Sequence, residues 1–130
     1  MVNRKSPWTV AGVFLLLLGL VPGLTARNNG FRTTYLTFSQ PVRLPGVSLG
    51  SGTYIFELAD PTSGAGAVRV LSRDRKNAYF LGLTTPVERP RRLNHGIAAV
   101  SLGESTPGSA PPITAWWPMD ASTGHAFIYD

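Results

Sequence analysis

Cysteine is absent from all 130 residues, and histidine occurs only twice. Without thiols the chain has no disulfide bonds, no N-terminal cysteine for lipid attachment and no cysteine-based zinc site. Charged residues are also sparse, at 15% of the chain. A domain of this composition must therefore be stabilised by its hydrophobic core.

The positive charge of the chain is modest once its location is considered. The formal net charge is +5, from twelve Lys and Arg against seven Asp and Glu. Arg4 and Lys5 belong to a leader, so the remaining chain has an excess of three positive charges. No aromatic and basic pattern typical of RNA-binding strands occurs. We therefore expect no nucleic-acid partner.

The first 26 residues follow the three-part pattern of a secretory signal peptide. Two basic residues precede an apolar run over Val10–Val21, and Pro22-Gly23 separates it from the small residues Thr25-Ala26. This run has twelve residues, whereas a membrane-spanning helix needs about 20. We expect a cleaved signal helix over residues 1–26 and export to the periplasm or the exterior. An uncleaved membrane anchor and a buried core helix are the alternatives, and membrane contact is expected only through an uncleaved leader.

The rest of the chain has the turn-rich composition and alternating pattern of β structure. Fourteen Gly and eleven Pro occur without a period, which favours many turns. After a polar linker over 27–31, residues 32–130 are expected to form one domain. Alternation predicts strands over Thr33–Ser39, Thr53–Ala59, Ala67–Leu71, Ala78–Thr84, Ile97–Leu102, Ile113–Trp117 and His125–Tyr129. The predicted fold is all-β, a small antiparallel β-sandwich or barrel of seven or eight short strands.

Local signals add detail to this prediction. Pro45-Gly46 fits the two central positions of a type II turn. The polar segment 72–77 is expected to be the turn of a hairpin, and the basic segment 86–96 a connection without strand structure. A sandwich also leaves strand edges open, and an open edge along Ala126–Tyr129 is one option without a specific signal in its favour.

Two stretches resemble a family of small, exported, uncharacterised bacterial proteins. The first runs from Leu36-Thr37-Phe38 through Pro45-Gly46 to Gly52-Thr53-Tyr54, and the second from Ala115-Trp116-Trp117-Pro118 to Tyr129. The Pro-rich segment with Glu104, Pro107, Gly108, Pro111 and Pro112 also fits the family pattern. The resemblance covers Arg32–Asp130 and implies a compact β domain, but no activity. Met119 and the end at Asp130 depart from the pattern, which leaves the loop around Met119 and the last strand less well defined.

The sequence holds no convincing catalytic or metal-binding constellation. A serine hydrolase needs Ser, His and an acid, and His125 with Asp120 or a nearby Ser would supply them, but no Gly-x-Ser-x-Gly elbow occurs. His95 and His125 do not have the spacing of a metal site. We expect no enzyme, no metal and no cofactor, with a small exported hydrolase as the alternative.

The leading functional hypothesis is a non-catalytic binding domain of the cell envelope, whose partner is an unknown protein or glycan. The predicted ligand-binding residues are Trp116, Trp117, Tyr129, Arg89, Arg91 and Arg92. Adjacent strand residues point to opposite faces, so one indole is expected in the core while the other is free to stack on a sugar ring as in a carbohydrate-binding module. For both indoles, however, a core or edge-covering role is favoured over an exposed platform, and for the arginines a solvated loop is favoured over ligand binding.

Overall fold

The computed structural model describes residues 33–62, 64 and 66–130, and this part of the chain is all-β. No helix occurs in it, and thus none that is long and apolar enough to cross a membrane. The predicted signal helix over residues 1–26 and the linker over 27–31 lie outside the described residues.

Nine strands make up the described part. They are β3 (Thr33–Phe38), β4 (Val42–Leu44), β5 (Val47–Leu49), β6 (Gly52–Leu58), β7 (Ala67–Ser72), β8 (Ala78–Glu88), β9 (Ala99–Leu102), β10 (Ile113–Trp117) and β11 (Thr123–Phe127). Seven of them form one antiparallel sheet in the order β3-β6-β7-β8-β11-β10-β9, while β4 and β5 form a separate hairpin. The prediction of an all-β, antiparallel fold is confirmed.

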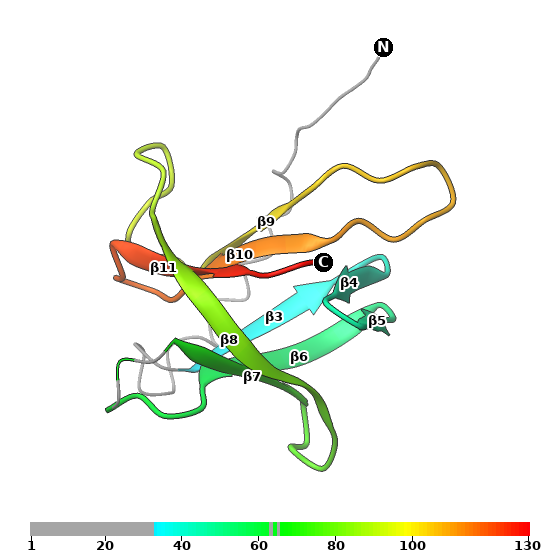
Figure 1. Ribbon diagram of the computed structural model, residues 1–130, viewed down its shortest axis with the longest axis horizontal. Coiled ribbons are helices and arrows are strands. Elements are labelled where there is room, and N and C mark those ends of the chain that lie inside the picture. The colour runs from blue at the N-terminus through cyan, green and yellow to red at the C-terminus, as the bar shows by residue number, and fades with distance from the viewer. Residues whose placement is uncertain (1–32, 63, 65) are drawn as a thin grey trace.

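Strand β8 belongs to both halves of the large sheet. Its first part pairs with β7, from Ala78 to Leu83, and its last part pairs with β11, from Thr84 to Glu88. The sheet curls along this long strand, so that β3 and β6 lie opposite β9 and β10 (Figure 1). Side chains on the inner faces of the two halves therefore meet.

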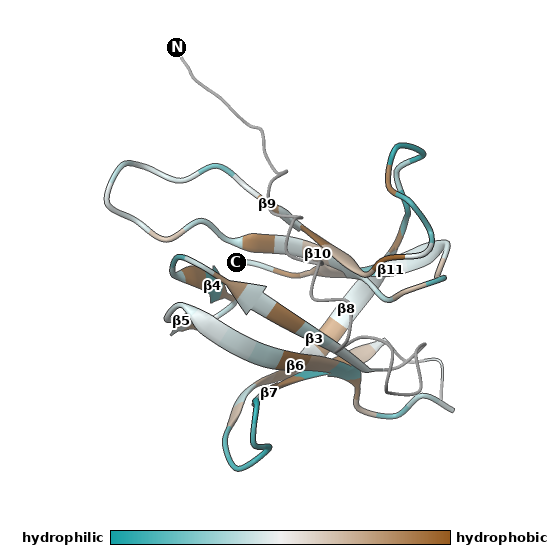
Figure 2. Cartoon of the chain, turned by 180° about the vertical axis from the view of Figure 1, so that it is seen from behind, coloured by the Kyte–Doolittle hydropathy of each residue, from teal (hydrophilic) through white to brown (hydrophobic). Residues whose placement is uncertain are grey.

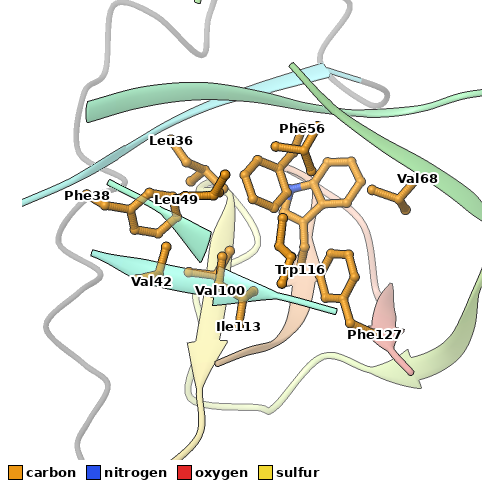
Figure 3. Close-up of a cluster of buried hydrophobic side chains, with 12 residues drawn as sticks. Leu36, Phe38, Val42, Leu49, Phe56, Val68, Val100, Ile113, Trp116 and Phe127 are labelled. Atoms are coloured by element: carbon orange, nitrogen blue, oxygen red, sulfur yellow. The ribbon is translucent and has the colours of Figure 1, made fainter. Parts of the chain in front are cut away.

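The alternation of the sequence selects which side chains enter this interior. Leu36 and Phe38 of β3 are buried, as is Phe56 of β6, and in a strand such residues at every second position share one face. Figure 3 shows the resulting cluster, in which Trp116 of β10 meets Phe56 and Phe127. The ring centroids lie 5.9 Å apart for Phe56 and Trp116 and 6.4 Å apart for Phe56 and Phe127. Burial of each such side chain contributes about 1.5 to 3 kcal/mol.

The β4–β5 hairpin joins the first part of the sheet to the segment before β10. Its turn is Pro45-Gly46, and Gly46 has a φ of +79°, as the second central position of the predicted type II turn requires. Val42, Leu44 and Leu49 are buried in the core. The backbone N–H of Arg43 donates to the Pro111 carbonyl at 3.0 Å.

Several strand boundaries differ from the prediction: β9 begins at Ala99 instead of Ile97, and the differences in β8 and β11 have a physical reason. Strand β8 continues through Pro86 to Glu88, where a connection was expected. Thr84 donates its N–H towards β7, to Gly66, and by alternation the position of Pro86 faces the same side. Because β7 does not extend that far, the missing N–H of Pro86 breaks no ladder bond.

The last strand also differs, since it spans Thr123–Phe127 instead of His125–Tyr129. It lies between β8 and β10, so the option of an open edge along Ala126–Tyr129 is wrong for the paired residues Ala126 and Phe127. The chain leaves the sheet after Phe127, where the Tyr129 hydroxyl bonds to backbone carbonyls outside β11. Side-chain anchoring therefore ends the strand earlier than alternation predicts.

Hydrophobic residues concentrate along the strands, whereas the turn between β7 and β8 is strongly hydrophilic (Figure 2). That turn contains Arg73, Asp74 and Lys76, all exposed. The predicted hairpin of residues 67–84 is confirmed by the pairing of β7 with β8.

Gly124 offers a test of the packing on the outer face of the sheet. A Cβ atom there would overlap the Trp117 ring and lie 2.6 Å from the Trp116 carbonyl oxygen. Because backbone cannot move aside as a flexible side chain does, we expect Gly124→Ala to lower the free energy of unfolding by about 2 to 3 kcal/mol in urea denaturation. Gly50→Ala is the matched control, since a Cβ there meets nothing within 4 Å, and it should change stability by less than about 0.5 kcal/mol. Equal effects of the two substitutions would contradict this packing.

Candidate functional site

The three arginines expected to bind a ligand do not form one cluster. Arg89 is buried, with 7% of its surface exposed. Its guanidinium donates to three backbone carbonyls, of Ala121 at 2.7 Å, Asn94 at 3.0 Å and Pro118 at 2.7 Å. Burial lowers its pKa from the ordinary value, against the opposing charge of Asp120. Arg89 thus joins the loop between β8 and β9 to the loop between β10 and β11 and is not free to engage a ligand.

Arg91 and Arg92 are exposed in the loop that follows. The Arg89 side chain points into the protein and contacts backbone carbonyls, whereas the side chains of Arg91 and Arg92 are exposed to solvent. The sequence cluster is therefore one structural arginine followed by two solvated ones.

The indoles of Trp116 and Trp117 are both buried, which agrees with the favoured core role for both and contradicts the exposed aromatic platform. The two rings do lie on opposite faces of the sheet, as alternation predicts. Trp116 is in the main core, and Trp117 packs with Ala99 and Ala115 in a second cluster on the outer face. Leu93, from the loop after β8, covers this second cluster. Trp117 also donates its Nε1–H to the Val87 carbonyl at 3.3 Å.

The Trp116 indole N–H is buried and has no hydrogen-bond partner in the described part of the chain. Leaving such a donor unpaired costs about 1 to 3 kcal/mol. Its position is therefore set by packing among aromatic rings and not by a polar contact.

His125 lies on the inner face of β11 beside this indole. Its ring stacks on Trp116 with centroids 5.4 Å apart and an interplanar angle of 29°. Its Nδ1 lies 3.3 Å from the Thr84 hydroxyl, and burial lowers its pKa below the ordinary value of 6.5. Within the described part, no hydrogen bond joins His125 to Asp120 or to a serine, and no three His, Asp or Glu side chains gather as a metal site requires.

Glu57 is a buried carboxylate on the outer face of β6 that pairs with two solvent-accessible arginines. Arg69 contacts its carboxylate at 2.6 Å and Arg75 at 3.0 Å. Burial opposes ionisation of Glu57, but the hydrogen bonds and charges of Arg75 and Arg69 outweigh it, so the pKa lies below its ordinary value. Both arginines are thereby committed to structure.

An open cleft of about 480 Å³ lies between the β4–β5 turn and the end of the chain. It is lined by Arg43, Pro45, Gly46, Pro112, Ile128, Tyr129 and Asp130. The Tyr129 hydroxyl lies 2.7 Å from the Ile113 carbonyl oxygen and 3.1 Å from that of Arg43. Burial raises the pKa of Tyr129 to about 12, so its hydroxyl stays protonated. Of the predicted ligand-binding residues, Tyr129 lies in this cleft.

Exposed large hydrophobic side chains gather on β8. Leu81 and Leu83 are 67% and 63% exposed, and Tyr79, on the same strand, is 39% exposed. Ile128 is also exposed, at 53%, but it lies beyond the end of β11 and lines the cleft near the chain end. We call the exposed pair Leu81 and Leu83 the apolar strip.

The part of β8 that carries Leu81 and Leu83 has a neighbouring strand on one side. Pairing with β11 begins at Thr84, so residues Ala78–Leu83 pair with β7 alone in the described structure. Thr84 directs its N–H to Gly66, before β7, and successive residues of a strand alternate in this direction. The N–H and C=O groups of Leu81 therefore point to the side without a strand.

No family model, no curated protein and no solved structure matches the chain. The resemblance to a family of exported bacterial proteins therefore stays a prediction.

Sequence reasoning missed both the cleft and the apolar strip. A signal for the strip was present, because the alternation that places Phe80 inside places Leu81 and Leu83 outside. No such signal marks the cleft, since Arg43 and Tyr129 are 86 residues apart in the chain.

Substitution of the arginines tests their different roles. Arg89→Lys removes the planar fork that reaches three carbonyls, and we expect it to lower the free energy of unfolding by about 3 kcal/mol. Arg91→Lys and Arg92→Lys are the matched controls and should have effects below about 0.5 kcal/mol. Urea denaturation of the three variants measures this, and a stable Arg89→Lys protein would contradict the structural role.

The pH dependence of stability tests the environment of His125. Because its pKa is lowered by folding, the unfolded chain takes up the proton first as the pH falls. Its contribution to stability is therefore complete above pH 6.5 and decreases below it. We expect His125→Gln to reduce the loss of stability between pH 7.5 and 5.5 in chemical denaturation. A loss of stability in His125→Gln as large as that of the unsubstituted protein would contradict this environment.

Proposed function

We propose that this chain is an exported, non-catalytic binding domain that holds a partner protein by adding an extended segment of the partner to β8. Export rests on the leader pattern of residues 1–26. The observation that carries the binding role is the coincidence of exposed leucines with the unpaired side of a strand. In this proposal the curled sheet and the β4–β5 hairpin act as a small β-sandwich or barrel that holds β8 rigid.

The exposed side chains distinguish β8 from the other strands with an unpaired side. The outer strands β3 and β9 also end the large sheet, but no large hydrophobic side chain on them is exposed. Proteins usually protect unpaired strands with charges, prolines or bulges. A bulge occurs between Val70 and Leu71, opposite the start of β8, yet Leu81 and Leu83 remain uncovered in the described structure.

The backbone of β8 has hydrogen-bonding groups available on its unpaired side. Leu81 directs both backbone polar groups to the unpaired side, so an extended peptide can form main-chain hydrogen bonds with it. In strand addition these bonds supply affinity, while alternate side chains supply specificity. Leu81 and Leu83 would contact every second side chain of the added segment.

The turn before β8 indicates the charge of the partner. Arg73 and Lys76 are exposed, and neither forms an ion pair within the described residues. The Asp74 carboxylate is held by the Ser72 hydroxyl at 2.7 Å and by the Lys76 N–H at 2.9 Å. We therefore expect the added segment to alternate apolar residues along β8 and to carry an acidic residue near this turn.

A proline at position 81 tests strand addition directly. Octapeptides selected from a random displayed library on the purified protein should shift the amide signals of Leu81 and Leu83 in NMR spectra. Leu81→Pro removes an N–H on the unpaired side and leaves the hydrogen bonds between β7 and β8 intact. It should therefore lower the affinity for these peptides at least about tenfold, or about 1.4 kcal/mol.

Leu81→Ala is the matched control, because it removes the side chain but keeps the N–H. It should weaken binding less than Leu81→Pro does, and urea denaturation verifies that both variants fold. Peptides that bind equally well to Leu81→Pro, or that shift amides elsewhere, would overturn the proposal.

A further inference from the structure

The cleft between the β4–β5 turn and the chain end is separate from the unpaired side of β8 and has a different chemistry. We propose that it is a binding site for an organic oxyanion, whose charged oxygens are held by the Arg43 guanidinium and whose apolar body packs on the cleft wall. This inference does not depend on strand addition to β8.

The Arg43 guanidinium is held in place on one side and free on the other. Its Nε donates to the Ala110 carbonyl at 3.2 Å, and its Cζ lies 5.6 Å from the centre of the Tyr129 ring. Its two terminal nitrogens have no hydrogen-bond acceptor within the described part of the chain. A guanidinium fixed in this way loses little freedom when it binds two oxygens side by side.

The other buried or paired arginines lack this availability. Arg69 and Arg75 contact Glu57, and Arg89 is surrounded by carbonyls. Arg43 instead faces an open cleft. Its partner ring is neutral, because the Tyr129 hydroxyl is held by two carbonyls and stays protonated.

The walls of the cleft are suited to an apolar group. Pro45, Pro112 and Ile128 line it together with the Tyr129 ring, and its volume of about 480 Å³ lies within the range of small-molecule sites. A simple inorganic ion would leave these walls unused. An aryl or alkyl carboxylate or phosphate would use both the guanidinium and the walls.

Asp130 also lines the cleft, so its negative charge lies near any bound ligand. Its carboxylate forms no ion pair with Arg43 within the described residues. A bound oxyanion would be repelled by it through solvent, so removal of that charge should strengthen binding. Loss of the Asp130 charge and loss of the Arg43 charge thus have opposite expected effects.

The test is a calorimetric or NMR titration of the full chain with phenyl phosphate and benzoate. Inorganic phosphate and neutral benzamide serve as comparison ligands. We expect both organic anions to bind, inorganic phosphate to bind at least about fivefold more weakly, and benzamide at least about tenfold more weakly. Equal binding of benzamide would overturn the anion assignment, and equal binding of inorganic phosphate would overturn the role of the apolar walls.

Three variants locate the site. Arg43→Gln should lower the affinity for phenyl phosphate at least about tenfold. Arg92→Gln, at an exposed loop position, should leave this affinity unchanged. Asp130→Asn should strengthen the binding of phenyl phosphate about twofold to threefold. This result tests the site even if Arg43→Gln folds poorly. Unchanged binding in Arg43→Gln, or weaker binding in Asp130→Asn, would contradict the proposed site.

Discussion

The contact between Phe56 and Trp116 joins the two halves of the curled sheet, and the remaining architecture follows from it. Phe56 belongs to the half that begins with β3, and Trp116 to the half that ends with β9. Their rings meet only because the sheet curls along β8, which both halves share. Removal of this large aromatic surface from water is therefore what holds the curl.

This curl has consequences for the surface. A long shared strand can pair with β7 over one part and β11 over the other, which leaves the first part of β8 with an unpaired side. Meanwhile the β4–β5 hairpin and the last residues of the chain meet where Tyr129 bonds to the carbonyls of Ile113 and Arg43. Both proposed binding surfaces thus arise at places where the sheet pairing ends.

Polar groups in the described structure are used mainly to secure connections between strands. Arg89 holds the loops around β11 through backbone carbonyls, and Glu57 holds Arg69 and Arg75 over the outer face of β6. The half-buried His125 contacts Thr84 and an aromatic ring. Arg43 differs from these groups. Its guanidinium is held by the Ala110 carbonyl and the Tyr129 ring, while its two terminal nitrogens have no acceptor in the described structure.

The strand prediction succeeded where side-chain alternation was strong. Residues 53–59 and 67–84 were placed correctly to within a residue or two because apolar positions at every second residue leave one face to bury. The boundaries at Pro86 and Phe127 were wrong, since each depends on where a neighbouring strand ends. Residue type alone carries no information on that point.

The amino-acid sequence by itself determined the all-β class, the Pro45-Gly46 turn and which face of most strands is buried. These features depend on backbone geometry and on contacts with near neighbours. Only the tertiary structure decided that Arg89 and Trp117 are buried, that Leu81 lies on an unpaired side and that Arg43 meets Tyr129. These outcomes depend on contacts between residues far apart in the chain, where burial and hydrogen bonding are settled by the packing of whole elements.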